Sequence, residues 1–265
     1  MNQNHNPASR AYEKYDVFRK FLQRKCGRAP LPSDMDKLIR DRLPAWIEEI
    51  PKNARILDAG CAEGYLLEAL SRVGYKNLTG LDLSENMLEI ARKRLPPDIK
   101  LIRADILPWI EDTKSNSFDV IFFNQVLEHI PREDTIKVLR EFHRVLTFNG
   151  RISISVPNMA SLIGSFTMAI DFSHLTHFTE NSLFQVLVMA GFDANSIEFI
   201  SQAPRLFWSW RNPHKALLRM LNRIRWHINH FVHWIIYYVL LDFPYAHIFD
   251  PSLVVVAKKS KNLTE

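Results

Sequence analysis

The segment 54–64, which reads Ala-Arg-Ile-Leu-Asp-Ala-Gly-Cys-Ala-Glu-Gly, constrains the fold of this 265-residue chain more than any other. An apolar strand ends in an acid, Asp58, and two glycines then bracket a tight turn before a helix begins. A second strand-like run, 77–81, is followed by another acid, Asp82. This order is typical of a Rossmann-type unit, in which the turn and the helix N-terminus approach an adenosine-bearing cofactor and the second acid binds the ribose hydroxyls.

The rest of the chain alternates strand-like and helix-like runs joined by short loops. We expect strands at 54–58, 77–81, 99–104, 118–123, 150–156, 196–201 and 252–257. We expect helices at 64–72, 85–94, 133–145 and 179–189. Gly74 and Gly150 stand where helix ends favour a residue with positive φ. This alternation predicts an α/β fold, a Rossmann-like and mostly parallel sheet with helices on both faces.

The turn at 60–64 also indicates which cofactor binds. Its Gly-Cys-Ala-Glu-Gly spacing differs from the Gly-x-Gly-x-x-Gly of dinucleotide enzymes and favours S-adenosylmethionine over NAD. From 52 to 156, and more loosely to 258, the chain resembles the class I S-adenosylmethionine-dependent methyltransferases. Within them it is most similar to the small-molecule group, with its ubiquinone-type and glycan- or lipid-biosynthesis O-methyltransferases. The resemblance implies S-adenosyl-L-methionine as cofactor and a seven-stranded sheet whose last strand is antiparallel.

Ala62 departs from the usual first loop of that family, which reads acid-x-Gly-x-Gly-x-Gly. The chain matches this pattern at Asp58, Gly60 and Gly64. Because alanine has a Cβ, we expect the φ angle of Ala62 to stay negative. The departure does not change the expected cofactor.

The resemblance implies a set of cofactor-binding residues. Asp58 would order the loop or receive the methionine ammonium through water, and Asp82 would accept hydrogen bonds from both ribose hydroxyls. Asp105 would lie beside the adenine amino group. For Asp82 and Asp105 the alternative is a helix cap at the end of a strand. The full expected set is Asp58, Gly60, Cys61, Ala62, Gly64, Asp82, Leu83, Met87, Asp105, Ile106, Asn124 and Gln125.

The segment 118–130 resembles the family's fourth strand and the loop that passes under the sulfonium. Glu128 and His129 reproduce a Glu-His pair seen in many relatives, including ubiquinone-type enzymes, which use a further Glu three residues earlier as a metal ligand. This chain has Gln125 at that place, an inferior ligand, so we expect no metal. The alternative for the Glu-His pair is that it only stabilises the following helix.

The segment 171–179 reads Asp-Phe-Ser-His-Leu-Thr-His-Phe-Thr and adds two histidines. A similar His-x-x-x-Phe-Thr segment lines the substrate side of the pocket in many relatives. We expect the catalytic residues among His129, His174 and His177, because a neutral imidazole is a suitable general base. A core or capping histidine is the alternative, and His177 suits that role better. The acid and two histidines of this segment are only a weak indication of a metal site.

The segment 203–250 departs most from the family. Within it, residues 205–241 carry six Lys and Arg residues and no acid, and four of the six tryptophans of the chain lie there. Aliphatic and aromatic residues at 217, 221, 224, 228, 231 and 235 form one helical stripe. A basic amphipathic helix with tryptophans predicts contact with an anionic membrane surface. The alternative is a cap on its own domain or on a dimer partner. Nucleic acid is not expected, because bulky aliphatic residues interrupt the basic ones.

Composition bounds the location and the domain organisation. Two cysteines, Cys26 and Cys61, provide no disulfide framework, and the first residues are too polar for a secretory signal. We therefore expect a cytoplasmic protein that contacts the inner membrane surface peripherally. The net charge of +5 is compatible with an anionic partner. We expect three parts: a helical extension at 1–50, a core at 51–202 and 251–260, and a helical insertion at 203–250.

Together these features predict the transfer of a methyl group from S-adenosylmethionine to a small-molecule acceptor. By analogy with the relatives, the acceptor atom is expected to be an oxygen of a sugar, a lipid-linked compound or a quinone-like compound. Two other classes of function stay open. One is a non-catalytic, membrane-associated scaffold, which the departures at Ala62 and Gln125 would suit. The other, less favoured, is a nicotinamide-dependent oxidoreductase. No oligomeric state follows from the sequence.

Overall fold

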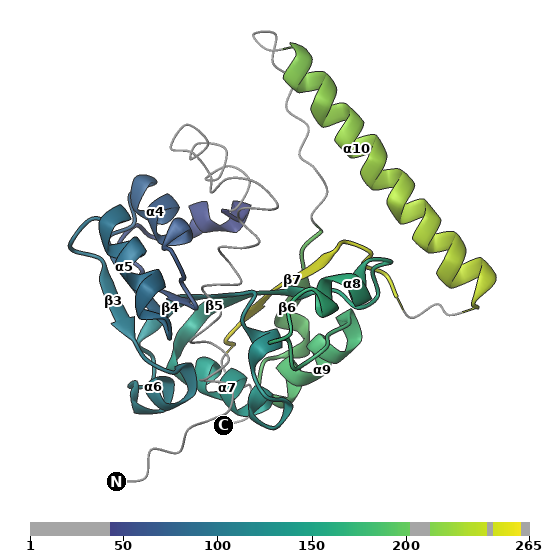
Figure 1. The fold of residues 1–265 in the computed structure, drawn as a ribbon. Helices are drawn as coiled ribbons and strands as arrows, with labels where there is room; N and C mark the ends of the chain where they lie inside the picture. The colour runs from purple at the N-terminus through teal and green to yellow at the C-terminus, as the bar shows by residue number, and fades with distance from the viewer. Residues whose placement is uncertain (1–42, 202–212, 243–245, 261–265) are drawn as a thin grey trace.

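A seven-stranded sheet with helices on both faces forms the centre of the molecule (Figure 1). The computed structural model describes residues 43–201, 213–242 and 246–260. The strand order is β3-β2-β1-β4-β5-β7-β6, and β7 runs antiparallel to both β5 and β6 while the other pairs are parallel. The strands are β1 (Arg55–Ala59), β2 (Asn77–Asp82), β3 (Lys100–Arg103), β4 (Phe118–Asn124), β5 (Leu146–Pro157), β6 (Ile197–Phe199) and β7 (Ser252–Lys258). This confirms the predicted fold.

The central strands are apolar on both faces because each face is covered by helices. Neighbouring side chains of a strand point to opposite faces, so Ile56 packs in one hydrophobic cluster and Leu57 in the other. The first cluster includes residues of α4 (Tyr65–Arg72) and α5 (Glu85–Arg94). The second includes residues of α6 (Ile106–Asp112), α7 (Arg132–Val145) and α9 (Glu180–Met189). Burial on both sides is typical of a parallel sheet and holds the carboxyl ends of β1, β2 and β4 in fixed positions.

Two helices of the structure were not predicted. Helix α6 contains Pro108, which argues against a helix in a sequence, but the proline lies in the first turn, where backbone N–H groups lack intrahelical partners in any case. Helix α8 (Gly164–Ala169) is short and begins with glycine, so it has no clear periodic signal. The predicted helix at 179–189 is confirmed, with Thr179 as its N-cap and Ser182 completing a capping box.

The expectation for the two glycines was right at one position and wrong at the other. Gly74 has φ +97° after α4, as expected. Gly150 lies inside β5, and Asn149 takes the left-handed conformation instead, with φ +62°. Glycine at position 150 allows the backbone of Thr147 to approach closely, because a Cβ there would lie 2.8 Å from the carbonyl oxygen of Thr147.

The outer parts of the chain are helical where the structure describes them. A short 3-10 helix, η2 (Ala45–Glu49), follows Pro44, while most of the predicted N-terminal extension lies outside the described residues. The insertion forms α10 (Pro213–Trp234), which continues as a π-helical turn, η5 (Ile235–Leu240). Helix α10 lies outside the layered core (Figure 1). Among the described residues, no helix combines the length and the apolar character that crossing a bilayer requires.

Candidate active site

The loops that follow β1 and β4 meet at the carboxyl edge of the sheet. Four residues in these loops have left-handed backbones: Gly60 (φ +83°), Ala62 (φ +45°), Gly64 (φ +76°) and Gln125 (φ +55°). The two loops pack closely, because a Cβ on Gly60 would overlap Cγ2 of Val126. The sharp turns leave helix α4 starting directly at this edge, with Gly64 as its N-cap.

The φ angle of Ala62 corrects the prediction from the sequence. We expected a negative value, and the structure has +45°. The backbone N–H of Ala62 donates a 2.8 Å hydrogen bond to Oδ2 of Asp82, which holds the residue in this conformation. The loop therefore has the backbone conformation that a glycine would favour. For alanine, whose Cβ opposes a left-handed backbone, this conformation costs about 1 kcal/mol.

Asp82 connects the first loop to the end of β2. Its Oδ2 accepts from Ala62 N–H, and its Oδ1 accepts from the N–H of Ser84 at 2.9 Å. Ser84 itself is the N-cap of α5. A carboxylate has lone pairs beyond these two bonds, so Asp82 can still accept from a vicinal diol. Its role toward ribose stays a prediction.

Asp58 is a buried acid beneath the first loop, with 3 % of its surface exposed. Burial, together with the charge of Asp82, raises the pKa of its carboxyl to about 7. A cation placed beside Asp58 would favour the ionised form, and an ammonium group has the required charge. Burial also raises the pKa of the Cys61 thiol, so Cys61 is expected to line the loop as an unreactive thiol.

The remaining predicted cofactor residues follow β2, β3 and β4. Asp105 is the N-cap of α6, its Oδ1 accepting from Leu107 N–H at 3.4 Å, and its place beside the adenine amino group stays a prediction. Gln125 is exposed, and its Nε2 donates to Oγ of Ser155 at 2.9 Å. Asn124 ends β4 beside it. The others lie at helix starts or within a turn: Leu83 before α5, Met87 buried in its first turn, and Ile106 as the first residue of α6. Contact of these residues with a cofactor stays a prediction.

Glu128, His129 and His174 form a buried cluster that the sequence did not show as a unit. A 3-10 turn, η3 (Leu127–His129), places the first two directly after the β4 loop. The segment 171–176 folds over them, because the N–H groups of Leu175 and Thr176 both donate to the backbone oxygen of Glu128, at 2.7 and 3.0 Å. The two imidazole rings have their centroids 4.7 Å apart.

Hydrogen bonds fix the tautomers of both histidines in this cluster. Nδ1 of His174 lies 3.2 Å from the carbonyl oxygen of Met168, so it must carry the proton. Nδ1 of His129 lies 3.0 Å from Oγ of Ser173, and this hydroxyl donates to Asp171, so His129 also donates from Nδ1. In both rings the lone pair is therefore on Nε2.

The protonation of the cluster follows from its burial. Neither carboxyl oxygen of Glu128 has a hydrogen-bond partner among the described residues, and Nε2 of His174 lies 4.0 Å from Oε1. Burial, with the charge of Asp171, raises the pKa of Glu128 to about 8. Burial, with the neighbouring His174, lowers the pKa of His129 to about 4. At neutral pH the cluster holds a protonated carboxyl beside a neutral imidazole.

The cluster also fits a divalent metal ion. One ligand atom from each of Glu128, His129 and His174 lies within 4.8 Å of the others. One carboxylate and two imidazoles are ligands of catalytic zinc and other first-row metals, and an orphaned carboxyl is what a missing cation would leave. We expected no metal because of Gln125, but the third potential ligand comes from His174, far along the chain. His177 is exposed, and the structure does not bring it into the cluster.

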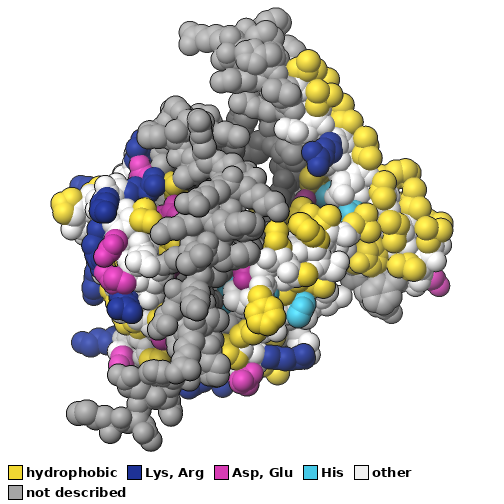
Figure 2. Space-filling view, in the orientation of Figure 1, with side chains coloured by type: hydrophobic (Ala, Val, Ile, Leu, Met, Phe, Trp, Pro, Cys, Tyr) yellow, Lys and Arg dark blue, Asp and Glu magenta, His cyan; other side chains and the backbone are white. Residues whose placement is uncertain are grey.

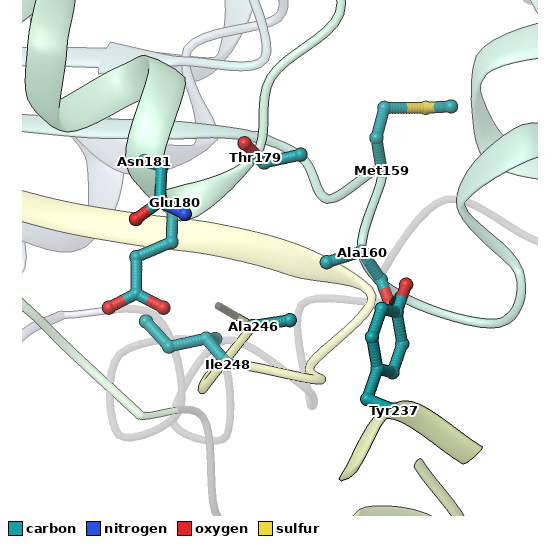
Figure 3. Close-up of a pocket in the computed structure, with 8 residues that line it drawn as sticks. All are labelled: Met159, Ala160, Thr179, Glu180, Asn181, Tyr237, Ala246 and Ile248. Atoms are coloured by element: carbon teal, nitrogen blue, oxygen red, sulfur yellow. Dashed lines mark hydrogen bonds between the residues drawn. The ribbon is translucent and has the colours of Figure 1, made fainter. Parts of the chain in front are cut away.

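A pocket of about 180 Å³ lies between the start of α9, the residues that follow β5 and Tyr237 (Figure 3). Thr179 and Glu180, which line the pocket, follow in the chain the segment 171–176 that covers the cluster. Glu180 points toward it from the start of α9, and Tyr237 lies on its opposite side (Figure 3). Its lining includes Met159, Ala160, Thr179, Glu180, Tyr237 and Ile248.

The strand order with antiparallel β7 and the glycine-bracketed first loop define a class I methyltransferase domain, the S-adenosylmethionine-dependent type of the α/β fold. Comparison with known families agrees: residues 56–150 match the model described as "Methyltransferase domain".

Known proteins are similar to this chain over part of their length. A ubiquinone biosynthesis O-methyltransferase of Pseudomonas aeruginosa is 32% identical over 120 residues, which cover 43% of this chain and 49% of that protein. A demethylmenaquinone methyltransferase of Staphylococcus epidermidis is 31% identical over 148 residues, 54% of each chain. The chain thus spans about half the length of the curated relatives it matches. A crystal structure of a SAM-dependent methyltransferase from Archaeoglobus fulgidus has the same fold, with TM-score 0.62, 17% identity and coverage of 91% of this chain and 99% of that chain.

Proposed function

We propose that the protein transfers a methyl group from S-adenosylmethionine to an oxygen of a small-molecule acceptor. The cluster of Glu128, His129 and His174 carries this proposal, because it lies next to the β4 loop on the same edge of the sheet as the first loop. The family match of residues 56–150 supports the methyl donor and disfavours the nicotinamide alternative. When bound, the donor supplies an electrophilic methyl on a sulfonium, so the protein must mainly align the acceptor and exclude water.

The residues of the first loop are proposed to hold the donor. Asp82 would accept from the ribose hydroxyls, and the raised pKa of Asp58 indicates a buried acid that a cationic ammonium group would stabilise. The strained φ of Ala62 supports a loop that keeps the binding conformation despite its alanine. This removes one of the two departures, Ala62 and Gln125, that would suit the scaffold alternative.

The cluster is proposed to take the proton of the acceptor hydroxyl. Nε2 of His174 has a lone pair, because its Nδ1 donates to Met168, and it can act as the general base. Oε1 of Glu128 lies 4.0 Å from this Nε2, so Glu128 would stabilise the imidazolium in those molecules in which it has already released its own proton to solvent. If Glu128, His129 and His174 held a divalent cation instead, Nε2 of His174 would be a ligand and no longer a base, and the charge of the cation would lower the pKa of a bound hydroxyl.

The acceptor is proposed to be a sugar, a lipid-linked compound or a quinone-like compound. The names of the similar proteins, which refer to ubiquinone and menaquinone methylation, support the quinone-like class. The mainly apolar pocket at the start of α9, with Glu180 and Tyr237 as polar groups, supports an acceptor of mixed character. The protein is proposed to lie in the cytoplasm, at the inner membrane surface. The exposed face of α10 supports the contact with that surface.

Calorimetric titration with S-adenosylhomocysteine tests the donor site. We expect binding by the wild type and strong loss of affinity in Asp82→Asn. Binding of NADH instead would indicate the oxidoreductase, and binding of neither would indicate the scaffold. Incubation with radiolabelled methyl donor and fractionated cell extract then tests transfer. We expect one fraction to gain label with the wild type and not with His174→Asn, while both proteins still bind S-adenosylhomocysteine.

A further inference from the structure

Helix α10 turns a polar and aromatic face toward the rest of the protein. Nε1 of Trp226 donates to Oδ1 of Asp250 at 2.8 Å, and the hydroxyl of Tyr237, just beyond the helix, donates to the backbone oxygen of Ala160 at 2.9 Å. These contacts recur at the spacing of successive helical turns, so they fix which side of α10 faces inward.

His233 is the most buried contact of this inward face, with 1 % of its surface exposed. Its Nε2 accepts from the N–H of Leu162 at 2.8 Å, and its Nδ1 donates to the backbone oxygen of Asn229 at 2.7 Å. The ring also stacks on Phe249, with centroids 4.9 Å apart. The anchor of α10 is therefore made of directional hydrogen bonds and ring contacts.

The opposite side of α10 is an exposed apolar face. Its residues are between 46 and 59 % exposed, although all are aliphatic or aromatic. At about 100° per residue they fall within an arc of about 80°. Hydrophobic side chains accordingly gather along α10 in Figure 2. We define the apolar face as Leu217, Leu221, Ile224, Ile228 and Phe231.

A second exposed apolar stretch lies between the inward contacts of α10 and the candidate active site. It begins at Leu162, which bonds His233, and includes Ile163, Phe166, Ile170, Phe172 and Leu175, each at least 42 % exposed. Phe172 and Leu175 flank Ser173 and His174, which lie on the buried cluster. In the segment that covers Glu128, the side chains of Phe172 and Leu175 are thus exposed, whereas those of Ser173 and His174 contact the buried cluster.

The Lys and Arg residues of the segment that holds α10 are not balanced by acids of the same segment. The segment 203–241 contains six Lys and Arg residues and no Asp or Glu. By helical spacing, Arg223 and Arg225 lie on opposite sides of the apolar face. Two copies of the chain joined through this face would bring these arginines together, which is unfavourable. An anionic surface instead complements them.

We propose that α10 lies on the surface of an anionic membrane, with its apolar face in the boundary between headgroups and acyl chains. The arginines beside the face would contact the lipid headgroups, as in other interfacial amphipathic helices. The stretch 162–175 would then face the same membrane and admit an acceptor dissolved in or anchored to it. This last step rests on the proposed function, whereas membrane binding itself does not.

Vesicle co-sedimentation tests the proposal on the full chain. We expect the wild type to sediment with phosphatidylcholine vesicles that contain about one third phosphatidylglycerol, to bind pure phosphatidylcholine far more weakly, and to be released by high salt. Arg223→Gln combined with Arg225→Gln should weaken binding about 30-fold, or about fivefold for each charge. Ile228→Asn should weaken it about tenfold.

Phe148→Asn is the matched control, because Phe148 is 54 % exposed in β5 whereas Ile228 is 58 % exposed in α10. It should bind vesicles like the wild type. Equal sedimentation of all variants, or a wild type that stays in the supernatant, overturns the proposal. A dimer in light scattering that Ile228→Asn dissolves would assign the face to a second copy instead. Binding of S-adenosylhomocysteine, measured on the same proteins, separates failure of membrane binding from failure of the proposed function.

Discussion

Glu128→Gln offers a sharp test of the buried cluster, because its effect depends on pH in a defined direction. Burial raises the pKa of Glu128 from 4.5 to about 8. Between pH 4.5 and pH 8 the carboxyl of Glu128 keeps its proton in the folded protein but has lost it in the unfolded chain. The contribution of this proton to the free energy of unfolding is therefore complete below pH 4.5 and is lost as the pH rises toward 8.

The size of the effect follows from the same two values. With about 1.36 kcal/mol for each pKa unit, the free energy of unfolding should fall by about 3.5 kcal/mol between pH 5 and pH 8. Glutamine carries no titratable proton, so the variant should lack this loss. Asp58 contributes a loss of the same sign, because its pKa is also raised, but this loss is common to both proteins and cancels in their difference.

Urea unfolding of both proteins at pH 5 and pH 8 measures this difference. Relative to the wild type, Glu128→Gln should gain about 3 to 4 kcal/mol on going from pH 5 to pH 8, whatever its stability at pH 5. A difference between the two proteins that does not change with pH would refute the reasoning, because Glu128 would then be solvated or paired. Methyl transfer should be lost in the variant at both pH values.

Three further predictions concern the first loop and the cluster. Ala62→Gly should raise the free energy of unfolding by about 0.5 to 1 kcal/mol in urea denaturation, because it relieves the strained φ of +45°. Asp82→Asn should lower the affinity for S-adenosylhomocysteine at least tenfold in calorimetry, because the amide loses an acceptor and introduces a donor where two backbone N–H groups already point. Zn²⁺ should raise the midpoint of thermal unfolding of the wild type but not that of His174→Asn, more at pH 8 than at pH 6, because metal binding needs the ionised Glu128.

Each of these predictions has a control or a contrary outcome. Ala194→Gly, at an exposed residue without positive φ, should destabilise by about 0.5 to 1 kcal/mol, opposite in sign to Ala62→Gly. If both changes destabilise, the loop strain is absent. Unchanged nucleoside affinity in Asp82→Asn would remove Asp82 from the donor site. An equal thermal shift with Zn²⁺ in His174→Asn would place the metal elsewhere.

The fold could be predicted from the sequence wherever periodicity and end signals agreed. Ile56, Leu57 and Asp58 show why: two apolar residues in succession indicated a strand buried on both faces, and the acid marked its end. The signals failed where tertiary contacts overrode them. Pro108 hid a helix, and Gly150 indicated a turn although it permits close packing inside β5.

The site could be predicted only in its local parts. The prediction of a negative φ for Ala62 was wrong, because it considered only the steric effect of the Cβ. The hydrogen bond from the Ala62 N–H to Asp82 instead determines the backbone conformation. The pairing of Glu128 with His174 could not be foreseen, because it depends on where the segment 171–176 folds back. The sequence also showed the apolar stripe of α10 but not which side faces solvent, since that depends on Trp226 and other distant contacts.

The two hydrogen bonds from Leu175 and Thr176 to the main chain of Glu128 have a consequence for how this protein can diversify. They hold the rim of the site by backbone atoms alone, so they do not depend on the identity of the side chains that point outward. Phe172 and Leu175 are therefore open to exchange during evolution without disturbing the proton-handling residues beneath. A lineage can retune which molecules it accepts at these two positions while its chemistry stays constant.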